Sequence, residues 1–303
     1  MSVLGKLLSK GMQRQAARAE ALRRAGIEPI VPDHLRGEDL VGRGVEDQIT
    51  GGVRPLQEAA ERYMRDAGID YRPQRQFVEV DPEFATRVAK AYEEMKHNPN
   101  DPMVRAAYQK MIEETVAQYE ALRRAGYKFD FMPEGRDPYG NPRNAIKDLV
   151  QNKRMLVFPT EAGFGGPASK HIDVSDNPLL MKVGEKWSGK DVTANDLFRA
   201  VHDAFGHAKE GVGFRARGEE NAFQQHMTMY SPLAARAMAT ETRGQNSWVN
   251  FGPYAAKNRR ASPADTEYAP QKVGLLPDEL VFGRTVRADL LRRARELERS
   301  MGY

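Results

Sequence analysis

The sequence predicts a mainly α protein with a small β element (α+β), built as a helical domain with an extended N-terminal arm. Three observations support this fold class. Apolar residues recur at helical spacing along most of the chain, capping residues followed by proline mark several helix starts, and few short segments have the apolar character of strands. We expect the arm to cover 1–54 and the main domain to cover 55–303.

The arm is predicted to begin with a basic amphipathic helix over 2–25. Its apolar residues, among them Leu4, Leu8 and Met12, fall close to one helical stripe, and Gly26 follows as a terminator. Residues 27–54 are rich in Gly, Pro and Asp and indicate an extended connector. Such an arm can dock on a partner protein, on a membrane surface or on the chain's own core.

The first helices of the main domain are predicted from their start signals. Pro55 suits a first helical turn, and the pairs Asp81-Pro82 and Asp101-Pro102 each place an N-cap before a proline. The helices expected in this half are 55–69, 81–98, 101–127 and a shorter one within 137–154. The strands expected are 128–135 and 155–165, with a further short one within 70–80 and a loop-rich stretch over 166–192.

The second half contains the most polar stretch. Thr193 is a good N-cap with Asp196 three residues later, so a helix should start near Ala194. Ser231 and Pro232 mark the start of a later helix that we expect to end at Gly244. Residues 253–277 are predicted as a polar loop, and a charged C-terminal helix should begin near residue 284.

Composition narrows the chemistry. The 303 residues include no cysteine, which excludes disulfides and thiolate metal sites and leaves His, Asp and Glu as ligands. Mean hydropathy is −0.66 and no apolar run is long enough for a membrane span. The net charge of +4 comes from charges mixed along the chain, so nucleic-acid binding is not indicated.

Two histidines predict a metal site. His202 and His207 are five residues apart, which on an ideal α-helix is about 140° of rotation, so both reach one ion only if the helix loosens, and Gly206 favours that. Glu241 is expected in a last helical turn, where the macrodipole disfavours a carboxylate unless a cation is near. Two imidazoles and one carboxylate form the facial site of non-haem Fe(II) oxygenases. We therefore expect Fe(II), with zinc as the alternative.

Further polar residues are candidates for catalysis or substrate binding. Glu219 and His226 are seven residues apart and should share a helix face, as acid–base groups, as alternative ligands or as a buried hydrogen-bonded pair. A following polar stretch would either line a substrate pocket or satisfy its own backbone through amides. Its candidate substrate-binding residues are Arg243, Gln245, Asn246, Trp248 and Asn250.

A local resemblance adds to the metal hypothesis. The segment VHDAFGH, 201–207, resembles the metal-binding element of the pterin-dependent aromatic amino acid hydroxylases, and ATETRG, 239–244, resembles the element that supplies their glutamate. The resemblance implies iron held by His202, His207 and Glu241. No counterpart of the pterin-binding segment is found, so neither pterin nor an amino-acid substrate is carried over.

A broader resemblance covers about residues 100 to 281. The chain resembles an uncharacterised family of tailed-bacteriophage structural and polyvalent proteins. The motifs that carry this resemblance are, in order, DPYGNPRNAIKDL, NDLFRAVHDAFGHAKEGVGF, GEENAFQQHMTMYS, TETRGQNSWVNFGP and DTEYAPQKVGLLP. It implies a phage context, in the virion or the host cytoplasm, with other virion proteins as partners of 1–54. It implies no particular reaction.

Three functions follow from these patterns. The first is a phage-encoded, metal-dependent enzyme, an Fe(II) oxygenase or hydroxylase with an unknown substrate. The second is a zinc-dependent hydrolase in which Glu219 or Glu220 serves as the base. The third is a non-catalytic virion protein that docks through its N-terminal arm and uses the histidine cluster only as a structural site.

Overall fold

A computed structural model describes residues 52–69, 71, 73, 78–134, 136–162, 164, 172–261 and 265–285. The helix predicted over 2–25, nearly all of the connector up to residue 54 and the C-terminal helix beyond residue 285 lie outside the described residues.

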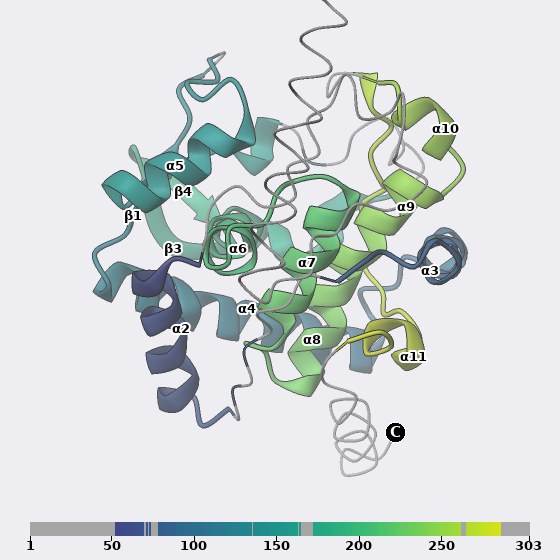
Figure 1. Ribbon diagram of the computed structural model, residues 1–303. Coiled ribbons are helices and arrows are strands. Elements are labelled where there is room, and N and C mark those ends of the chain that lie inside the picture. The colour runs from purple at the N-terminus through teal and green to yellow at the C-terminus, as the bar shows by residue number, and fades with distance from the viewer. Residues whose placement is uncertain are drawn as a thin grey trace, which may run out of the picture.

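The described part of the chain is mainly helical with two small sheets, which confirms the predicted fold class (Figure 1). The longer helices are α2 (Arg54–Asp66), α3 (Pro82–Glu94), α4 (Pro102–Arg124), α5 (Pro142–Asn152), α6 (Ala194–His202), α7 (Ala216–Met227), α8 (Pro232–Ala239) and α9 (Gln245–Phe251). Two shorter helices follow, α10 (Ala255–Asn258) and α11 (Asp278–Val281). The strands are β1 (Lys128–Phe131), β2 (Arg154–Val157), β3 (Lys182–Trp187) and β4 (Lys190–Thr193).

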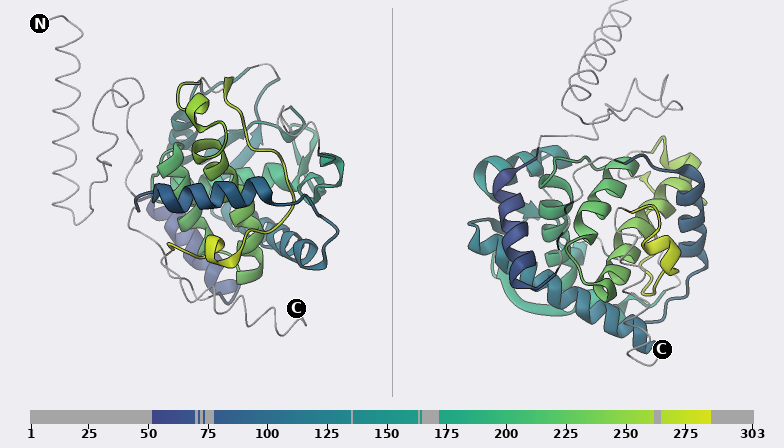
Figure 2. Two further views of the ribbon diagram at one scale, coloured as in Figure 1. Left: turned by 90° about the vertical axis from the view of Figure 1, so that its right-hand side faces the viewer. Right: turned by 60° about the horizontal axis from the view of Figure 1, so that its bottom comes forward.

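The long helix α4 joins two apolar clusters. In Figure 1, α6, α7 and α8 lie in the middle, with α2, α5 and the strands to one side and α3, α9 and α10 to the other. Figure 2 (right) shows α4 running beneath this row of helices. Its N-terminal half, with Tyr108 and Met111, packs into the cluster of α3, α8 and α11, whereas its C-terminal half, with Tyr119 and Leu122, packs into the cluster of α2, α5 and α6.

Between these halves α4 carries polar side chains in the interior. Thr115 and Gln118 are 3% and 0% exposed and face His226 and Tyr230, which are buried too. A buried polar group is tolerated only when it is hydrogen-bonded, so this layer must be a connected network. It lies where the two apolar clusters meet and where the candidate site is found.

Most predicted helix starts are confirmed. Asp81 and Asp101 each accept two backbone N–H groups of the helix that follows, with Pro82 and Pro102 in the first turn. Thr193 and Asp196 form a reciprocal capping box at the start of α6. The Asp196 carboxylate also accepts the backbone N–H and the hydroxyl of Thr160, so it ties the start of α6 to the segment after β2.

The strands were predicted in part. β1 and β2 pair in parallel, with Phe129 opposite Met155, and confirm the two expected strands. The hairpin of β3 and β4 lies within 166–193, where the sequence indicated loops, so that part of the prediction was wrong. Lys182 and Lys186 both bind Asp191 across this hairpin at 2.6 Å. The charged, half-exposed strands lack the apolar alternation on which the prediction depended.

The short strand expected within 70–80 is also absent from the described residues 78–80. Instead, the backbone N–H and C=O of Val78 bind the side-chain amide of Asn221 on α7, at 2.8 and 2.9 Å. No helix among the described residues is both long enough and apolar enough to span a bilayer.

Two helices continue into π-helical turns. α6 runs into a π-helix, Asp203–Ala208, and α8 runs into a second one, Thr240–Gly244, which leads directly into α9. The helix that begins at Pro232 therefore does not end at Gly244 as predicted. π-Turns inside helices are rare and occur frequently at functional sites.

Candidate metal centre

The first π-helix solves the spacing problem of the two histidines. His202 is the last residue of α6 and His207 lies five residues on, inside the π-turn that covers Asp203–Ala208. In a π-turn the backbone hydrogen bonds run from residue i to residue i+5, as seen from the Lys209 N–H to the Ala204 carbonyl at 2.9 Å. Residues five apart therefore come onto the same side of the helix, and the predicted loosening is confirmed.

Gly206 makes this geometry possible through its size. A Cβ atom at this position would lie 3.0 Å from Cε1 and Nδ1 of the His202 ring and 3.1 Å from the Ala222 carbonyl oxygen. The glycine lets α7 and the His202 ring pack directly onto the π-turn. Its role is therefore close approach, since its backbone is helical and not left-handed.

Glu219 completes the group from α7. Its Oε2 lies 3.4 Å from Nε2 of His207 and 3.9 Å from Nε2 of His202. One ligand atom from each of the three residues lies within 4.8 Å of the others, so the three could hold a metal ion. His202 and His207 are 8% and 1% exposed, whereas the Glu219 side chain is 27% exposed.

The His207 ring is fixed for coordination through Nε2. Its Nδ1 lies 3.0 Å from the Gly213 carbonyl oxygen, and because a carbonyl only accepts, Nδ1 carries the hydrogen. Phe214 stacks on the other side of the ring, with centroids 4.0 Å apart and planes at 14°. A backbone carbonyl on the far nitrogen is a usual partner of a metal-binding histidine.

The electrostatic interactions among the three groups favour an ionised Glu219 beside a protonated His207. Burial raises the pKa of the Glu219 carboxyl, but the neighbouring His207 and His202 outweigh burial and bring its pKa down to about 2. Burial lowers the pKa of His207, yet Glu219 and Asp203 outweigh it and raise the net pKa above its usual value. Without a cation, His207 and Glu219 thus form a buried ion pair, and a metal ion would replace the proton between them.

Asp203 adds a second carboxyl beside the group. It follows His202 in the chain, and burial raises its pKa in spite of the opposing charges of His207 and His202. The sequence alone does not distinguish this residue from an exposed helix acid. In the structure its charge interacts with both imidazoles and with Glu219.

His226 shares the α7 face with Glu219, as the seven-residue spacing predicted, but it binds His202 and not Glu219. Its Nδ1 lies 3.0 Å from Nδ1 of His202, and its Nε2 lies 2.8 Å from Oε1 of Gln118. The ring is fully buried. His226 is thus placed behind the candidate ligands, where it touches no open side of the site. Gln118 lies on α4, far away in sequence, and no local pattern singles it out.

Glu241 does not lie with the two histidines, contrary to the expectation from the sequence. Its carboxylate accepts a hydrogen bond from the Tyr108 hydroxyl and one from Nε2 of Gln245 at 2.8 Å, and it is no part of the His202, His207 and Glu219 group. The dipole argument failed because the helix continues through Gly244, so Glu241 does not lie at a helix end. Burial raises the pKa of Glu241 to about 7. The carboxyl is therefore neutralised by a proton and needs no cation beside it.

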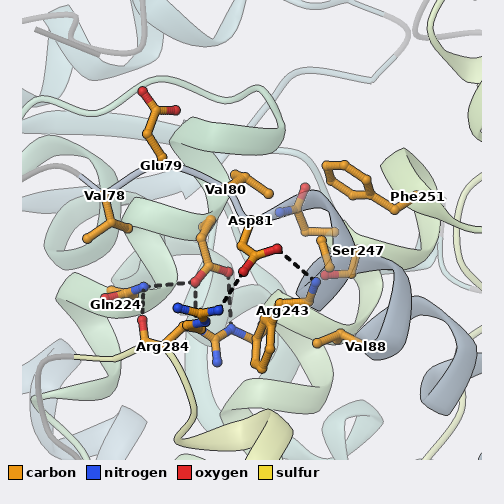
Figure 3. A pocket seen from close by; sticks show the side chains of 14 residues that line it. Val78, Glu79, Val80, Asp81, Val88, Gln224, Arg243, Ser247, Phe251 and Arg284 are labelled. Carbon is orange, nitrogen blue, oxygen red and sulfur yellow. Dashed lines mark hydrogen bonds and ion pairs between the residues drawn. The ribbon is translucent and has the colours of Figure 1, made fainter. Parts of the chain in front are cut away.

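Two of the five candidate substrate residues, Arg243 and Asn246, line a pocket of about 350 Å³ to which α7 contributes Glu220 and Gln224 (Figure 3). Arg243 is 1% exposed and is already saturated, because it binds the Glu220 carboxylate and the carbonyls of Leu280, Val281 and Gly283. Its role is to hold the segment around α11 in place. Asn246 lines the same pocket and donates to the Ala216 carbonyl at 3.0 Å.

The other three do not line this pocket. Gln245 binds Glu241, Trp248 donates its indole N–H to Glu93 and is 2% exposed, and Asn250 caps the Asn246 carbonyl at 2.9 Å. The contacts of Gln245 and Asn250 agree with the alternative reading of the sequence, in which amide side chains satisfy local structure. The stretch forms α9 and is not a loop.

The chain matches no protein-family model, no curated protein and no solved structure. The function is therefore argued from the geometry of the site, and both resemblances noted in the sequence remain expectations.

Proposed function

We propose that this chain is a metal-dependent enzyme whose centre is a divalent transition-metal ion bound by Nε2 of His202, Nε2 of His207 and the carboxylate of Glu219. The observation that carries the proposal is the convergence of these three groups from α6, a π-turn and α7 on one point. Two imidazoles and one carboxylate leave further coordination positions for reactants.

The spacing of the ligand atoms fits such an ion. Metal–ligand bonds of 2.0–2.2 Å at tetrahedral angles put neighbouring ligand atoms about 3.4 Å apart. The separations from Glu219 Oε2 are 3.4 Å to His207 and 3.9 Å to His202, and the three ligand atoms all lie within 4.8 Å of one another, so binding an ion would draw them together. The buried Nε2 of His202 has no hydrogen-bond partner among the described residues, which is costly unless a ligand binds there.

The favoured reaction is oxidation of a substrate by O₂ at Fe(II). Iron at a site of this kind supplies the redox chemistry, and a reducing co-substrate would provide the remaining electrons. The chain's own contributions are the orientation of the His207 ring by the Gly213 carbonyl, the Phe214 ring stacked on His207, and the Glu219 carboxylate as the third ligand.

Zinc-dependent hydrolysis is the second candidate, and Asp203 is the observation that favours it. Hydrolysis needs a group that takes a proton from the attacking water, and a carboxyl with a raised pKa beside the centre suits that task. Glu219, which the sequence offered as the base, is used as a ligand in this arrangement, and Glu220 is engaged by Arg243.

Metal binding is tested by comparing two glutamate-to-glutamine variants. Glu219→Gln should lose stoichiometric binding of Fe(II), Co(II) or Zn(II) in equilibrium dialysis of the chelator-stripped protein. Glu241→Gln makes the same change at a buried glutamate that faces no histidine, so it should bind like wild type. Equal loss in both variants, or no binding by the wild type, would refute the proposal.

Affinity alone does not identify the functional metal, because divalent zinc binds nitrogen and oxygen ligands more tightly than Fe(II) whatever the function. The two candidate functions are instead distinguished by the reaction that each metal form catalyses. Protein reloaded anaerobically with Fe(II) should consume O₂ in the presence of a reductant, and Glu219→Gln should not. O₂ consumption that is the same in both proteins, together with ester or peptide hydrolysis by the zinc form, would favour the second candidate.

A further inference from the structure

A line of buried hydrogen bonds runs from α4 to the candidate metal centre. It begins at the Met229 carbonyl, passes through the amide of Gln118 and the ring of His226, and reaches Nδ1 of His202. The three side chains are 0%, 0% and 8% exposed in that order. Because these side chains are buried, their hydrogen-bond partners in the protein decide where each hydrogen lies.

The Met229 carbonyl determines which group donates and which accepts in each hydrogen bond of this line. A carbonyl oxygen only accepts, so the group of Gln118 that lies 3.4 Å from it must be the NH₂ group, which leaves Oε1 pointing to His226. Oε1 also only accepts, so Nε2 of His226, at 2.8 Å, carries a hydrogen. A neutral His226 then has a lone pair on Nδ1.

That lone pair determines the tautomer of His202. Nδ1 of His226 accepts, so Nδ1 of His202, at 3.0 Å, donates. In a neutral His202 the lone pair is then on Nε2, the nitrogen that faces Glu219 and has no hydrogen-bond partner among the described residues. Phe198 stacks along both rings, at 5.7 Å from His202 and 6.1 Å from His226, and keeps them from turning over.

We infer that Gln118 and His226 are positioning residues that hold His202 as its Nδ1–H tautomer, so that its Nε2 is presented as a ready ligand for a metal ion. The consequence for metal affinity rests on the proposed function, but the tautomer itself does not. One backbone carbonyl holds the Nδ1–H of His207, whereas two side chains hold the Nδ1–H of His202.

The tautomers can be measured in the metal-free wild type by ¹⁵N–¹H long-range NMR correlation of histidine side chains, assigned with single substitutions. We expect His202 with hydrogen on Nδ1 and a bare Nε2, and His226 with the opposite pattern. A His202 ring that carries its hydrogen on Nε2, or a His226 ring with hydrogens on both nitrogens, would overturn the inference. This measurement needs no variant to fold.

Two substitutions on α4 separate positioning from packing. Gln118→Leu removes the hydrogen-bond acceptor of His226 and should weaken cobalt binding by roughly 10- to 100-fold. In the NMR spectra the His202 and His226 rings of this variant should show mixed tautomers in place of one defined tautomer each. Thr115→Val removes a buried hydroxyl on the same face of α4, bonded to Tyr230 at 2.8 Å, and should change neither. Equal effects of the two variants would show that the line is only structural.

The two proposals fail in different ways. Wild-type protein that shows the expected tautomers but binds no Fe(II), Co(II) or Zn(II) would refute the metal centre and leave the hydrogen-bond line established. Protein that binds metal tightly through Glu219, with His202 in the other tautomer, would refute the positioning role alone.

Discussion

Gly206→Ala is the sharpest test of how the π-turn builds the site. The added Cβ would meet the His202 ring at 3.0 Å, whereas carbon atoms rest at about 3.5 Å or more, so the ring must move by roughly half an ångström. Metal–ligand distances tolerate only about 0.2 Å. We expect metal affinity to fall by about 10- to 100-fold, or about 1.4 to 2.8 kcal/mol.

The effect on stability is estimated separately from the effect on affinity. Overpacking costs about 1–3 kcal/mol, while alanine gains up to about 1 kcal/mol over glycine in a helix, so the net loss in unfolding free energy should be about 2 kcal/mol at most. Affinity is measured by competition with a chelator, using cobalt as the reporter, and unfolding free energy by urea titration of the metal-free protein.

Gly244→Ala is the matched control, since Gly244 lies in the second π-turn. A Cβ there would meet the Tyr92 ring at 2.7 Å and Leu276 at 3.3 Å, so it disturbs packing far from the histidines. It should destabilise the protein and leave metal affinity unchanged. If Gly206→Ala binds cobalt like the wild type, or if both variants lose affinity equally, the role assigned to the π-turn is refuted.

Three further measurements address neighbouring features. The pKa of Glu241 is raised to about 7, so its contribution to the unfolding free energy is greatest below about pH 4.5 and is lost as pH rises toward 7. Between pH 4.5 and 8 the unfolding free energy of the wild type should fall by up to about 3 kcal/mol more than that of Glu241→Gln. Parallel curves of unfolding free energy against pH would contradict this. Asp196→Asn should lower the unfolding free energy by roughly 2–4 kcal/mol in urea titration, because an NH₂ group would face N–H and O–H donors of Thr160 or Thr193, and a loss below about 1 kcal/mol would count against it. Zinc at about 100 times its dissociation constant should add about 2.7 kcal/mol to the wild type and nothing to a His207→Gln variant.

Local start signals were sufficient to predict much of the helical framework. Asp101 with Pro102, and Thr193 with Asp196, lie within one turn of the helix they start, so a single sequence contains the whole signal. The hairpin of β3 and β4 has no such signal. It depends on Asp191 facing two lysines across the strands, and such pairing is visible only once the strands are placed.

The candidate site shows the same division. The pair His202 and His207 was predictable because its requirement for a loosened helix is local and Gly206 lies within it. The carboxylate beside them was not predictable, because Glu219 and Glu241 both follow at plausible distances along the chain. The spacing alone does not say which of the two turns toward the imidazoles. The preference for Glu241 depended on a helix end at Gly244.

The difference between the two glutamates lies in what surrounds each carboxylate. Glu219 faces His207 and His202, groups able to carry positive charge, and its pKa falls to about 2, so it remains an anion that a cation can bind. Glu241 faces a Tyr108 hydroxyl and an amide, which are neutral, and burial holds its proton up to about pH 7. A carboxyl that keeps its proton is a poor ligand for a metal ion. The charge of the neighbouring groups therefore distinguishes Glu219, the proposed ligand, from Glu241, and it is the fold and not the spacing of residues that sets these neighbours.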